Sequence, residues 1–227
     1  MIPTARPVAE DSLVELNLLL QLGDSALPTG AFSHSYGLES YLADGTISGE
    51  EELRQWLLVY LHTQLTCTDA LAMRWMYEGH SSPAELDGLL DAAVVPVQVR
   101  VASHKMGRQL VRIVPELLPS SGMPPDGWPR HYCLVFALAG QAAGIPLLPL
   151  LQTYLMSSVT SLVQNAVRAV PLGQLAGQRV LASLREPVSA GARHALELNE
   201  DDFGTTAPGV EIAQMRHEHL RARMFMS

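Results

Sequence analysis

The eight histidines offer the most chemistry in this sequence, because imidazole is the common protein ligand of transition metals and titrates near neutral pH. Their spacing does not predict a metal site. His217 and His219 are two positions apart, which places them on different sides of a helix, and no His-Glu-x-x-His pattern occurs. We interpret this pair as a solvated basic helix end. His34, between Ser33 and Ser35 in a glycine-rich turn, is expected to hydrogen-bond its loop rather than to hold a metal transiently.

The candidate nucleophiles are equally weak. Cys67 and Cys133 lie among threonine and aliphatic residues that would raise the pKa of a thiol, so both are expected to be buried structural cysteines. The only lysine, Lys105, does not belong to a phosphate-binding loop, and no Gly-x-Ser-x-Gly pattern is present. We therefore assign no catalytic, cofactor-binding or metal-binding residue and expect no enzyme activity.

A metal-dependent hydrolase built from helices is the alternative class. It rests only on the number of histidines, and its site would be drawn from His34, His104 or His131 with Asp24 and Glu39. A metal ion that stays bound through gel filtration would favour this alternative.

The composition predicts that the histidines and acids described above belong to one globular domain. The chain has 227 residues, 48% of them apolar, and its 15 basic and 23 acidic side chains give a formal charge of −8. This excludes a disordered or fibrous protein, and it argues against nucleic acid as a partner, because phosphate backbones bind a concentrated basic face. The two cysteines form no disulfide framework, and the start MIPTARPVAEDS lacks the apolar core of a secretion signal, so we expect a cytoplasmic protein with a flexible segment over residues 1–11.

One uncharged stretch is long enough to cross a bilayer, from Tyr132 to Leu151. Pro146 and Pro149 would break such a helix, and Gly140 with Gly144 forms a pair that also serves close helix packing in proteins outside membranes. We therefore expect no membrane span. The glycine pair fits a crossing within one subunit or at a dimer interface.

Helix signals dominate the remaining sequence, and no run alternates with the period of a strand. An amphipathic helix is predicted by the apolar stripe Leu53, Trp56, Leu57, Tyr60, Leu61 and Leu65. Three capping boxes predict helix starts at Ser12 with Glu15, Ser48 with Glu51, and Ser82 with Glu85.

Prolines and glycines predict where the later helices begin and end. Pro96 opens a helix whose apolar face is Met106, Leu110, Ile113 and Leu117. The prolines at 115, 119, 124, 125 and 129 then predict a long connection. From His131 to Leu198 several short, mostly buried helices are expected, with breaks at 144–146, 170–173 and 186–187; residues 199–209 form a surface loop, and a helical pattern returns in the final eighteen residues. The fold class is all-α: a single compact helical domain over residues 1–227, with about ten helices and mobile ends.

Two segments are unusual for a simple helical domain. Residues 19–39 predict a helix, a turn and a second helix, with Asp24 or Ser25 closing the first helix and Ser33 or Ser35 capping the second. Bulky groups crowd this turn, as expected for contact with another protein. The tail, residues 208–227, ends in apolar residues beside arginines and must dock on its own domain or on a partner.

These residues resemble the urease accessory protein UreF family. The segment from Leu20 to Glu39 is similar to the family's Gln-x-x-Asp-x-x-x-Pro-x-Gly-x-x-x-His-Ser-x-Gly-x-Glu run, and Lys105-Met106-Gly107-Arg108-Gln109, Val170-Pro171-Leu172-Gly173-Gln174 and Gly177-Gln178 resemble its central blocks. The end from Met215 to Ser227 is also similar, with Met224 where the family tends to have leucine. The matches follow one another in order over nearly the whole chain.

The resemblance implies a chaperone for nickel insertion into urease. Members of the family have an all-α fold, are usually homodimers, bind the accessory protein UreD (also called UreH) and recruit the GTPase UreG to apo-urease. They are thought to modulate that GTPase and to help pass nickel through a tunnel in the complex, so we expect nickel transit here rather than tight storage. The family's C-terminal tail orders on binding UreD.

The resemblance also implies partner-binding residues. Arg223 matches an arginine important in the family's tail, and Phe32 matches an aromatic residue that contributes to recruiting the GTPase. The expected partner-binding set is Phe32, His34, Tyr36, Glu39, Arg216, His217, Glu218, Arg221, Arg223, Phe225 and Ser227.

Overall fold

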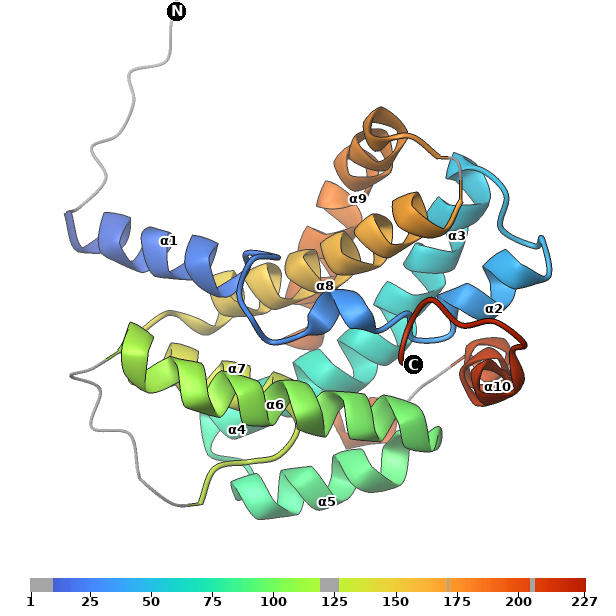
Figure 1. Cartoon of the computed structure of the whole chain (residues 1–227). Helices are drawn as coiled ribbons and strands as arrows, with labels where there is room; N and C mark the ends of the chain where they lie inside the picture. Colours follow the sequence, from blue (N-terminus) through green and yellow to red (C-terminus); the bar gives the residue numbers. More distant parts are fainter. Residues whose placement is uncertain (1–9, 119–126, 171, 205–206) are drawn as a thin grey trace, which may run out of the picture.

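The protein folds into packed helices. The structure, a computed structural model, describes residues 10–118, 127–170, 172–204 and 207–227. Within these ranges every regular element is helical, which confirms the predicted all-α class (Figure 1). The α-helices are α1 (Glu10–Leu22), α2 (Leu38–Ala43), α3 (Glu50–Tyr60), α4 (Leu71–Glu78), α5 (Pro83–Ala93), α6 (Val97–Leu117), α7 (Tyr132–Ala142), α8 (Leu147–Ala169), α9 (Gln174–Ala195) and α10 (Pro208–Arg216). The short elements are the 3₁₀ turns η1 (Ala31–Ser33), η3 (Glu200–Asp202) and η4 (His217–His219) and the π-helix η2 (Leu61–Ala70).

The core lies where the long helices α8 and α9 pack against each other and against α3 and η2. All six residues of the predicted apolar stripe between Leu53 and Leu65 are buried, which confirms that prediction. Helix α7 joins this core by packing on α4 and α6. The turn between α1 and α2 and the C-terminal tail lie beside each other on the outside of these helices (Figure 1).

A π-helical segment, η2, continues α3 directly into α4. Side chains support its wider turn: Thr66 Oγ1 donates a hydrogen bond to the Leu61 carbonyl at 2.7 Å, five residues back. Gly191 of α9 lies against this segment, where an added Cβ would come within 3.0 Å of the Thr66 hydroxyl. π-helical turns in proteins often occur at functional sites. Here the segment carries Gln64 and Asp69 towards a cavity described below.

Only one of the three predicted capping boxes is confirmed. Ser82 and Glu85 bond reciprocally at the start of α5. The box predicted at Ser48 is wrong, because α3 begins at Glu50 after Gly49 without a side-chain cap, and the Glu51 carboxylate instead accepts from Gln55 at 2.6 Å. The start predicted at Ser12 is also wrong, since Ser12 lies inside α1, which already includes Glu10.

Prolines stop fewer helices than predicted. The breaks near Pro146 and Gly173 are confirmed, whereas Pro115 lies inside α6 and Pro187 lies inside α9. The buried neighbours Val114 and Val188 hold both helices on the core, and this packing outweighs the backbone hydrogen bond that each proline removes. The region after His131 therefore forms two long helices and α7, rather than several short ones. Residues 119–126 of the predicted connection lie outside the described residues.

The uncharged stretch after His131 makes an internal helix crossing. Helix α7 ends at Ala142, and Gly144 follows in the left-handed region at φ +71°. A Cβ on Gly140 would lie 2.4 Å from the Leu150 side chain, so this glycine allows α8 to approach α7 within one chain. Among the described residues, no helix has the length and hydropathy needed to cross a membrane.

The end of the chain is less helical than predicted. Helix α10 ends at Arg216, η4 adds one turn, and the chain from Leu220 onward leaves helical conformation. The helix prediction for the final eighteen residues is therefore wrong beyond His219. The cause is tertiary: the Met224 and Phe225 amides bond to Glu39 of α2, and the Met226 amide bonds to the Ser33 carbonyl of the turn.

Candidate functional site

The turn between α1 and α2 has an unusual backbone. Gly30, Tyr36 and Gly37 all have positive φ angles, at 87°, 52° and 90°. The predicted order of helix, turn and helix is confirmed, but neither expected serine caps α2, whose N-cap is Gly37. Ser35 is unavailable because its hydroxyl donates to the tail. A tyrosine in the left-handed region costs about 1–2 kcal/mol, so other contacts must hold it there.

The tail supplies those contacts through its last residue. The main-chain oxygen of Ser227 accepts hydrogen bonds from the Tyr36 amide at 3.1 Å and from the Ser35 hydroxyl at 2.6 Å. Its side-chain oxygen lies 2.9 Å from Nδ1 of His34. His34 thus makes a hydrogen bond, as expected, but to the tail rather than within its own loop. The tail docks on its own domain.

Glu39 on α2 is the second anchor of the tail. One carboxylate oxygen accepts from the Met224 amide at 2.6 Å, and the other lies 2.6 Å from His217 Nε2 and accepts from the Phe225 amide at 3.2 Å. Glu39 and His217 are both buried. The interpretation of His217 as part of a solvated helix end is therefore wrong, because a buried carboxylate holds it. His219, two residues on, is exposed as expected.

Helix α8 contacts both the turn and the tail. The amide of Asn165 donates to the His34 carbonyl at 2.8 Å, and the Arg168 guanidinium lies 5.5 Å from the centre of the buried Phe225 ring. Arg168 also donates to the Phe32 carbonyl at 3.3 Å. The same helix therefore supports both the turn and the tail.

Helix α10 approaches the turn closely at Gly37. A Cβ there would come within 2.8 Å of the Gln214 side chain and 3.0 Å of its backbone nitrogen. Gln214 in turn donates to the Tyr36 carbonyl at 3.2 Å. Glycine is thus required twice at position 37, for its φ angle and for its lack of a side chain.

The expected partner-binding residues fall into two groups. Phe32 is 46% exposed, and the other exposed members are Arg216, Glu218, Arg221 and Arg223. The buried or half-buried members are His34, Tyr36, Glu39, His217, Phe225 and Ser227. The second group joins the tail to the turn. In this conformation the first group offers the most surface to another protein, together with Met224 and Met226, which are also exposed.

His34 is neutral in the docked state. Burial, and to a lesser extent the nearby Lys105 charge, lower the pKa of its imidazole from 6.5 to about 4. The ring therefore acts as a neutral hydrogen-bonding group beside Ser227 at physiological pH.

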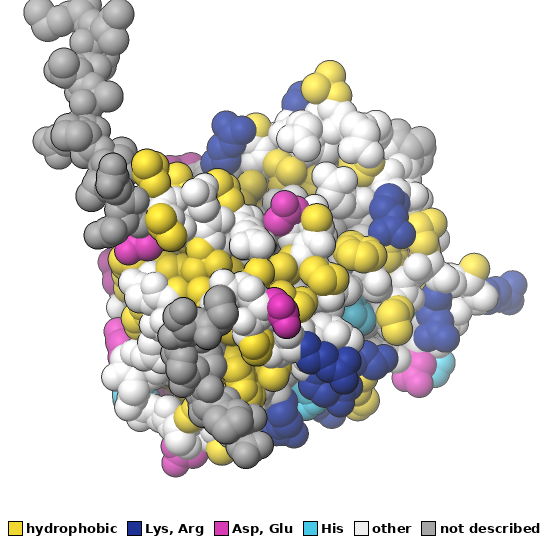
Figure 2. Space-filling model, turned by 60° about the vertical axis from the view of Figure 1, so that its left-hand side comes forward, with side chains coloured by type: hydrophobic (Ala, Val, Ile, Leu, Met, Phe, Trp, Pro, Cys, Tyr) yellow, Lys and Arg dark blue, Asp and Glu magenta, His cyan; other side chains and the backbone are white. Residues whose placement is uncertain are grey.

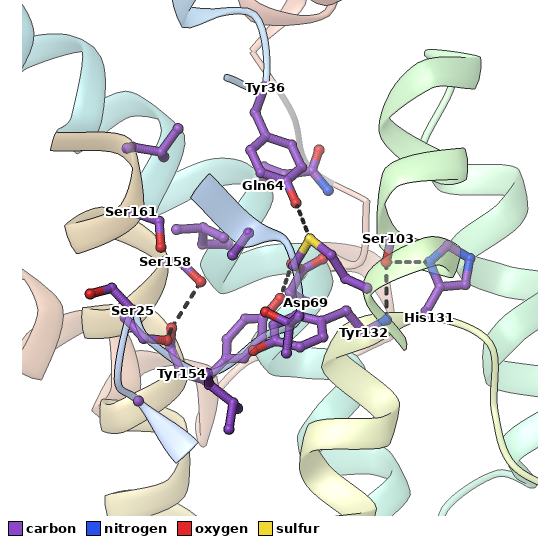
Figure 3. A pocket seen from close by; sticks show the side chains of 18 of the residues that line it. Ser25, Tyr36, Gln64, Asp69, Ser103, His131, Tyr132, Tyr154, Ser158 and Ser161 are labelled. Atoms are coloured by element: carbon purple, nitrogen blue, oxygen red, sulfur yellow. Dashed lines mark hydrogen bonds between the residues drawn. The ribbon is translucent and has the colours of Figure 1, made fainter. Parts of the chain in front are cut away.

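A cavity of about 60 Å³, lined by both polar and apolar side chains, lies between α1, η2, α6 and α8 (Figure 3). This is room for several water molecules. Its walls carry many hydroxyl groups, including those of Tyr36, Tyr132, Tyr154, Ser103 and Ser158, and the Asp69 carboxylate accepts from the Tyr154 hydroxyl at 2.6 Å. A cavity lined in this way can hold water or a hydrated cation.

Asp69 was not among the expected site residues. Burial raises the pKa of its carboxyl from 3.8 to about 6, although hydrogen bonds from Tyr154 and Gln64 oppose the shift. One signal was present in the sequence: the four-residue spacing of Leu61 and Leu65 continues to position 69, where an acid takes the place of an apolar residue. A charge on a buried helix face is a functional candidate.

A second polar cluster lies at the edge of the cavity, where Asp91 of α5 meets His104 of α6 and His131 at the start of α7. The two histidine Nε2 atoms lie 3.1 Å apart, and each lies 3.1 Å from Asp91 Oδ1. His131 is buried, and burial followed by the His104 charge lowers its pKa to about 4. Ser103 and His131 also line the cavity. Neither Asp91 nor the pairing of these histidines was expected, because their separations in sequence follow no metal-binding pattern.

The residues of the hydrolase alternative do not form one site. Asp24 is exposed and accepts from the Ala26 amide, and Glu39 is occupied by the tail. Both carboxylates are thus engaged away from His104 and His131, which pair with Asp91 instead. Cys67 and Cys133 are buried as expected, and burial raises the pKa of both thiols.

An exposed apolar face belongs to α1. Its side chains Leu13, Val14, Leu16 and Leu20 are between 48% and 71% exposed. Figure 2 shows hydrophobic side chains gathered on the face that carries this helix. Apolar patches of this kind commonly mark protein interfaces.

Known proteins share this sequence over most of its length. A sequence model of the UreF family matches residues 47–185. Proteins named urease accessory protein UreF from Arthrobacter sp. (strain FB24) and Paenarthrobacter aurescens (strain TC1) are 49% and 47% identical over 216 residues, which is 92% of this chain and 96% of each of them. A protein of the same name from Corynebacterium glutamicum (strain R) is 41% identical over 224 residues, covering 92% of this chain and 97% of its own length. The chain therefore belongs to the UreF family of urease accessory proteins, and its role lies in urease maturation.

Proposed function

We propose that this chain is a non-enzymatic, cytoplasmic chaperone that binds UreD/UreH and recruits the GTPase UreG to apo-urease, so that GTP hydrolysis is coupled to nickel delivery. The observation that carries the proposal is the joining of the turn and the tail into one surface. The two segments most suggestive of partner binding lie at opposite ends of the sequence, yet Ser227 bonds directly to Ser35 and Tyr36.

The composition of this surface suits a protein partner. Phe32 stands out from the turn, and Met224 and Met226 stand out from the tail. Arg221 and Arg223 are exposed beside them. Aromatic, methionine and arginine side chains are enriched where proteins bind one another. The buried contacts beneath would fix these side chains before binding and so reduce the entropy lost on association.

The cavity supports a role in nickel transit. Its hydroxyl groups and the Asp69 carboxylate give a cation successive oxygen ligands inside the fold. Such weak ligands allow a cation to move on, as expected for transit rather than storage. Nickel is in this proposal the cargo of the complex, not a resident cofactor.

A homodimer is part of the proposal, and the exposed apolar face of α1 supports it. A second copy of this chain or a partner subunit would cover Leu13, Val14, Leu16 and Leu20. Light scattering of Leu16→Glu would show whether this face holds the dimer, since a charge there would separate the two copies.

Reconstitution with the host's UreD and UreG tests the proposal. We expect gel filtration with light scattering to show two copies of this chain with UreD, joined by UreG. Arg223→Ala should weaken capture of UreD, and Phe32→Ala should weaken recruitment of UreG by more than about 1 kcal/mol in titration calorimetry. Leu175→Ala is the matched control, because Leu175 is also an exposed apolar residue but lies at the start of α9.

A folded chain that captures neither partner would overturn the proposal. If Phe32→Ala bound UreG with unchanged affinity, the turn would not be part of the interface, although the tail could still be. Deleting residues 215–227 abolishes UreD capture if the tail binds it, and circular dichroism of the deleted chain shows whether the core helices persist.

A further inference from the structure

The inference concerns the cluster of Asp91, His104 and His131. Three polar atoms meet there from three helices, each 3.1 Å from the other two. Ligand atoms that each lie about 2.1 Å from a metal ion are about 3.0 Å apart in an octahedral site and about 3.4 Å apart in a tetrahedral one. The observed spacing fits one face of such a site.

Hydrogen bonds alone do not satisfy this triangle. The carboxylate oxygen of Asp91 carries no hydrogen, and each Nε2 atom carries at most one. If both rings are protonated at Nε2, two hydrogens face each other between His104 and His131. If one ring is not, its lone pair faces the lone pairs of Asp91. With Asp91 ionised, at least one contact is therefore repulsive wherever the ring hydrogens lie, whereas a cation bound by all three atoms would be attracted to each of them.

The surroundings hold the three groups in position. Arg130 donates to Asp91 Oδ2 at 2.6 Å, which leaves Oδ1 directed at the histidines. The Ser103 hydroxyl lies 3.1 Å from His131 Nδ1 and accepts from the Tyr132 amide. An Nδ1–H donated to Ser103 leaves the Nε2 lone pair of His131 free for a metal, the arrangement that commonly orients histidine ligands. Figure 3 shows the His131 ring just beyond Ser103 at the edge of the cavity.

The cluster is accessible from outside the fold. The side chains of Asp91 and His104 are 32% and 22% exposed, whereas that of His131 is 2% exposed. An ion would reach the first two from solvent, and His131 and Ser103 separate it from the cavity. Three protein ligands leave further coordination positions open for water or for an exchanging ligand.

We propose that Asp91, His104 and His131 bind one divalent first-row transition-metal cation, which we assign as Ni²⁺. Two imidazoles and one carboxylate suit nickel, cobalt, iron and zinc, and disfavour Mg²⁺, which prefers oxygen ligands. The choice of nickel among them rests on the proposed function, but the site itself does not. Capture of UreD and UreG is measured by gel filtration and metal binding by calorimetry. A failure of the proposed function can therefore be told apart from a failure of the metal site.

Titration calorimetry of the metal-free full chain with NiCl₂ tests the site, with MgCl₂ as the comparison salt. We expect one Ni²⁺ per chain and no heat from Mg²⁺. His104→Ala and Asp91→Asn should each weaken binding by more than about ten-fold, and Ser103→Ala by about ten-fold through the orientation of His131. Both ligand variants change half-exposed side chains, so circular dichroism should show an unchanged fold.

Two variants are matched controls. His194 is an exposed histidine 4.0 Å from the Glu197 carboxylate, so His194→Ala removes a similar pair from α9. His219→Ala removes an exposed histidine of the tail. Neither should change the affinity. Cobalt loaded in place of nickel gives visible absorption bands that should weaken or shift in His104→Ala.

The outcomes separate the possibilities. Nickel that binds His104→Ala as tightly as the parent chain overturns the site, as does binding lost only in His219→Ala. Absence of any transition-metal binding to the folded parent chain also overturns it. Zinc or iron bound in place of nickel, with the same dependence on His104, supports the site and overturns its assignment to nickel.

Discussion

The contact between tail and turn and the cluster of Asp91, His104 and His131 are both built from polar groups, but they are satisfied differently. At Glu39, amide hydrogens from the tail meet carboxylate oxygens. In the cluster, three potential ligand atoms face one another and hydrogens cannot satisfy every contact. The first arrangement joins two parts of one chain, whereas the second attracts an ion. The balance of donors and acceptors, rather than burial alone, distinguishes a structural contact from a binding site.

The largest expected effect breaks the tail contact. Glu39→Ala removes the acceptor of two amides and the buried partner of His217. We expect the free energy of unfolding to fall by about 4 kcal/mol, because breaking a buried pair leaves its partner without compensation. Hydrogen exchange should show lost protection over residues 217–227. Glu50→Ala is the control, since the Glu50–Arg179 pair is exposed and its loss should change little; equal effects of the two variants would contradict the anchor role of Glu39.

A smaller effect of the opposite sign is expected at Asp69. The pKa of this carboxyl is about 6 in the fold and 3.8 in the unfolded chain, so the folded state binds the proton more tightly. The stability that this group contributes is therefore present below about pH 4 and is lost as the pH rises through about 6. Asp69→Asn removes the charge and should raise the free energy of unfolding at pH 7 by up to about 3 kcal/mol.

Urea unfolding between pH 4 and pH 7 measures this effect. The difference between Asp69→Asn and the parent chain should grow with pH over this range and level off above it. If Asp69→Asn were less stable than the parent chain at pH 7, hydrogen bonds in the fold would outweigh the cost of burying the carboxylate. The cavity would then resemble the contact between tail and turn, in which hydrogen bonds satisfy Glu39, and not a path for a cation.

The smallest expected effect tests the close approach of α10 to the turn. Gly37→Ala forces a side chain into the left-handed region and against Gln214, and should cost about 2 kcal/mol. Gly45→Ala is the matched control, because Gly45 has φ +78° but nothing within 4 Å of an added Cβ, so it should cost only about 1 kcal/mol. If Gly37→Ala and Gly45→Ala lowered the stability equally in thermal unfolding, α10 would be able to move away from the new side chain without loss of stability.

Local patterns predicted the parts of the fold that depend on neighbouring residues. The buried face from Leu53 to Leu65 follows from its spacing, and the capping box at Ser82 follows from a serine and a glutamate three residues apart. The same reasoning failed at Pro115 and Pro187, where packing on the core keeps the helices intact. The capping serine predicted for α2 failed because Ser35 bonds to a residue 192 positions away.

The sequence by itself determined the all-α class, the main helix breaks near Pro146 and Gly173, and the resemblance to UreF, because periodicity, proline and glycine act locally and ordered motifs span the chain. Only the tertiary structure decided which polar groups meet. His104 and His131 are 27 positions apart, and Glu39 and His217 are 178 apart. Such contacts depend on how the helices pack, and no spacing along the chain encodes that packing directly.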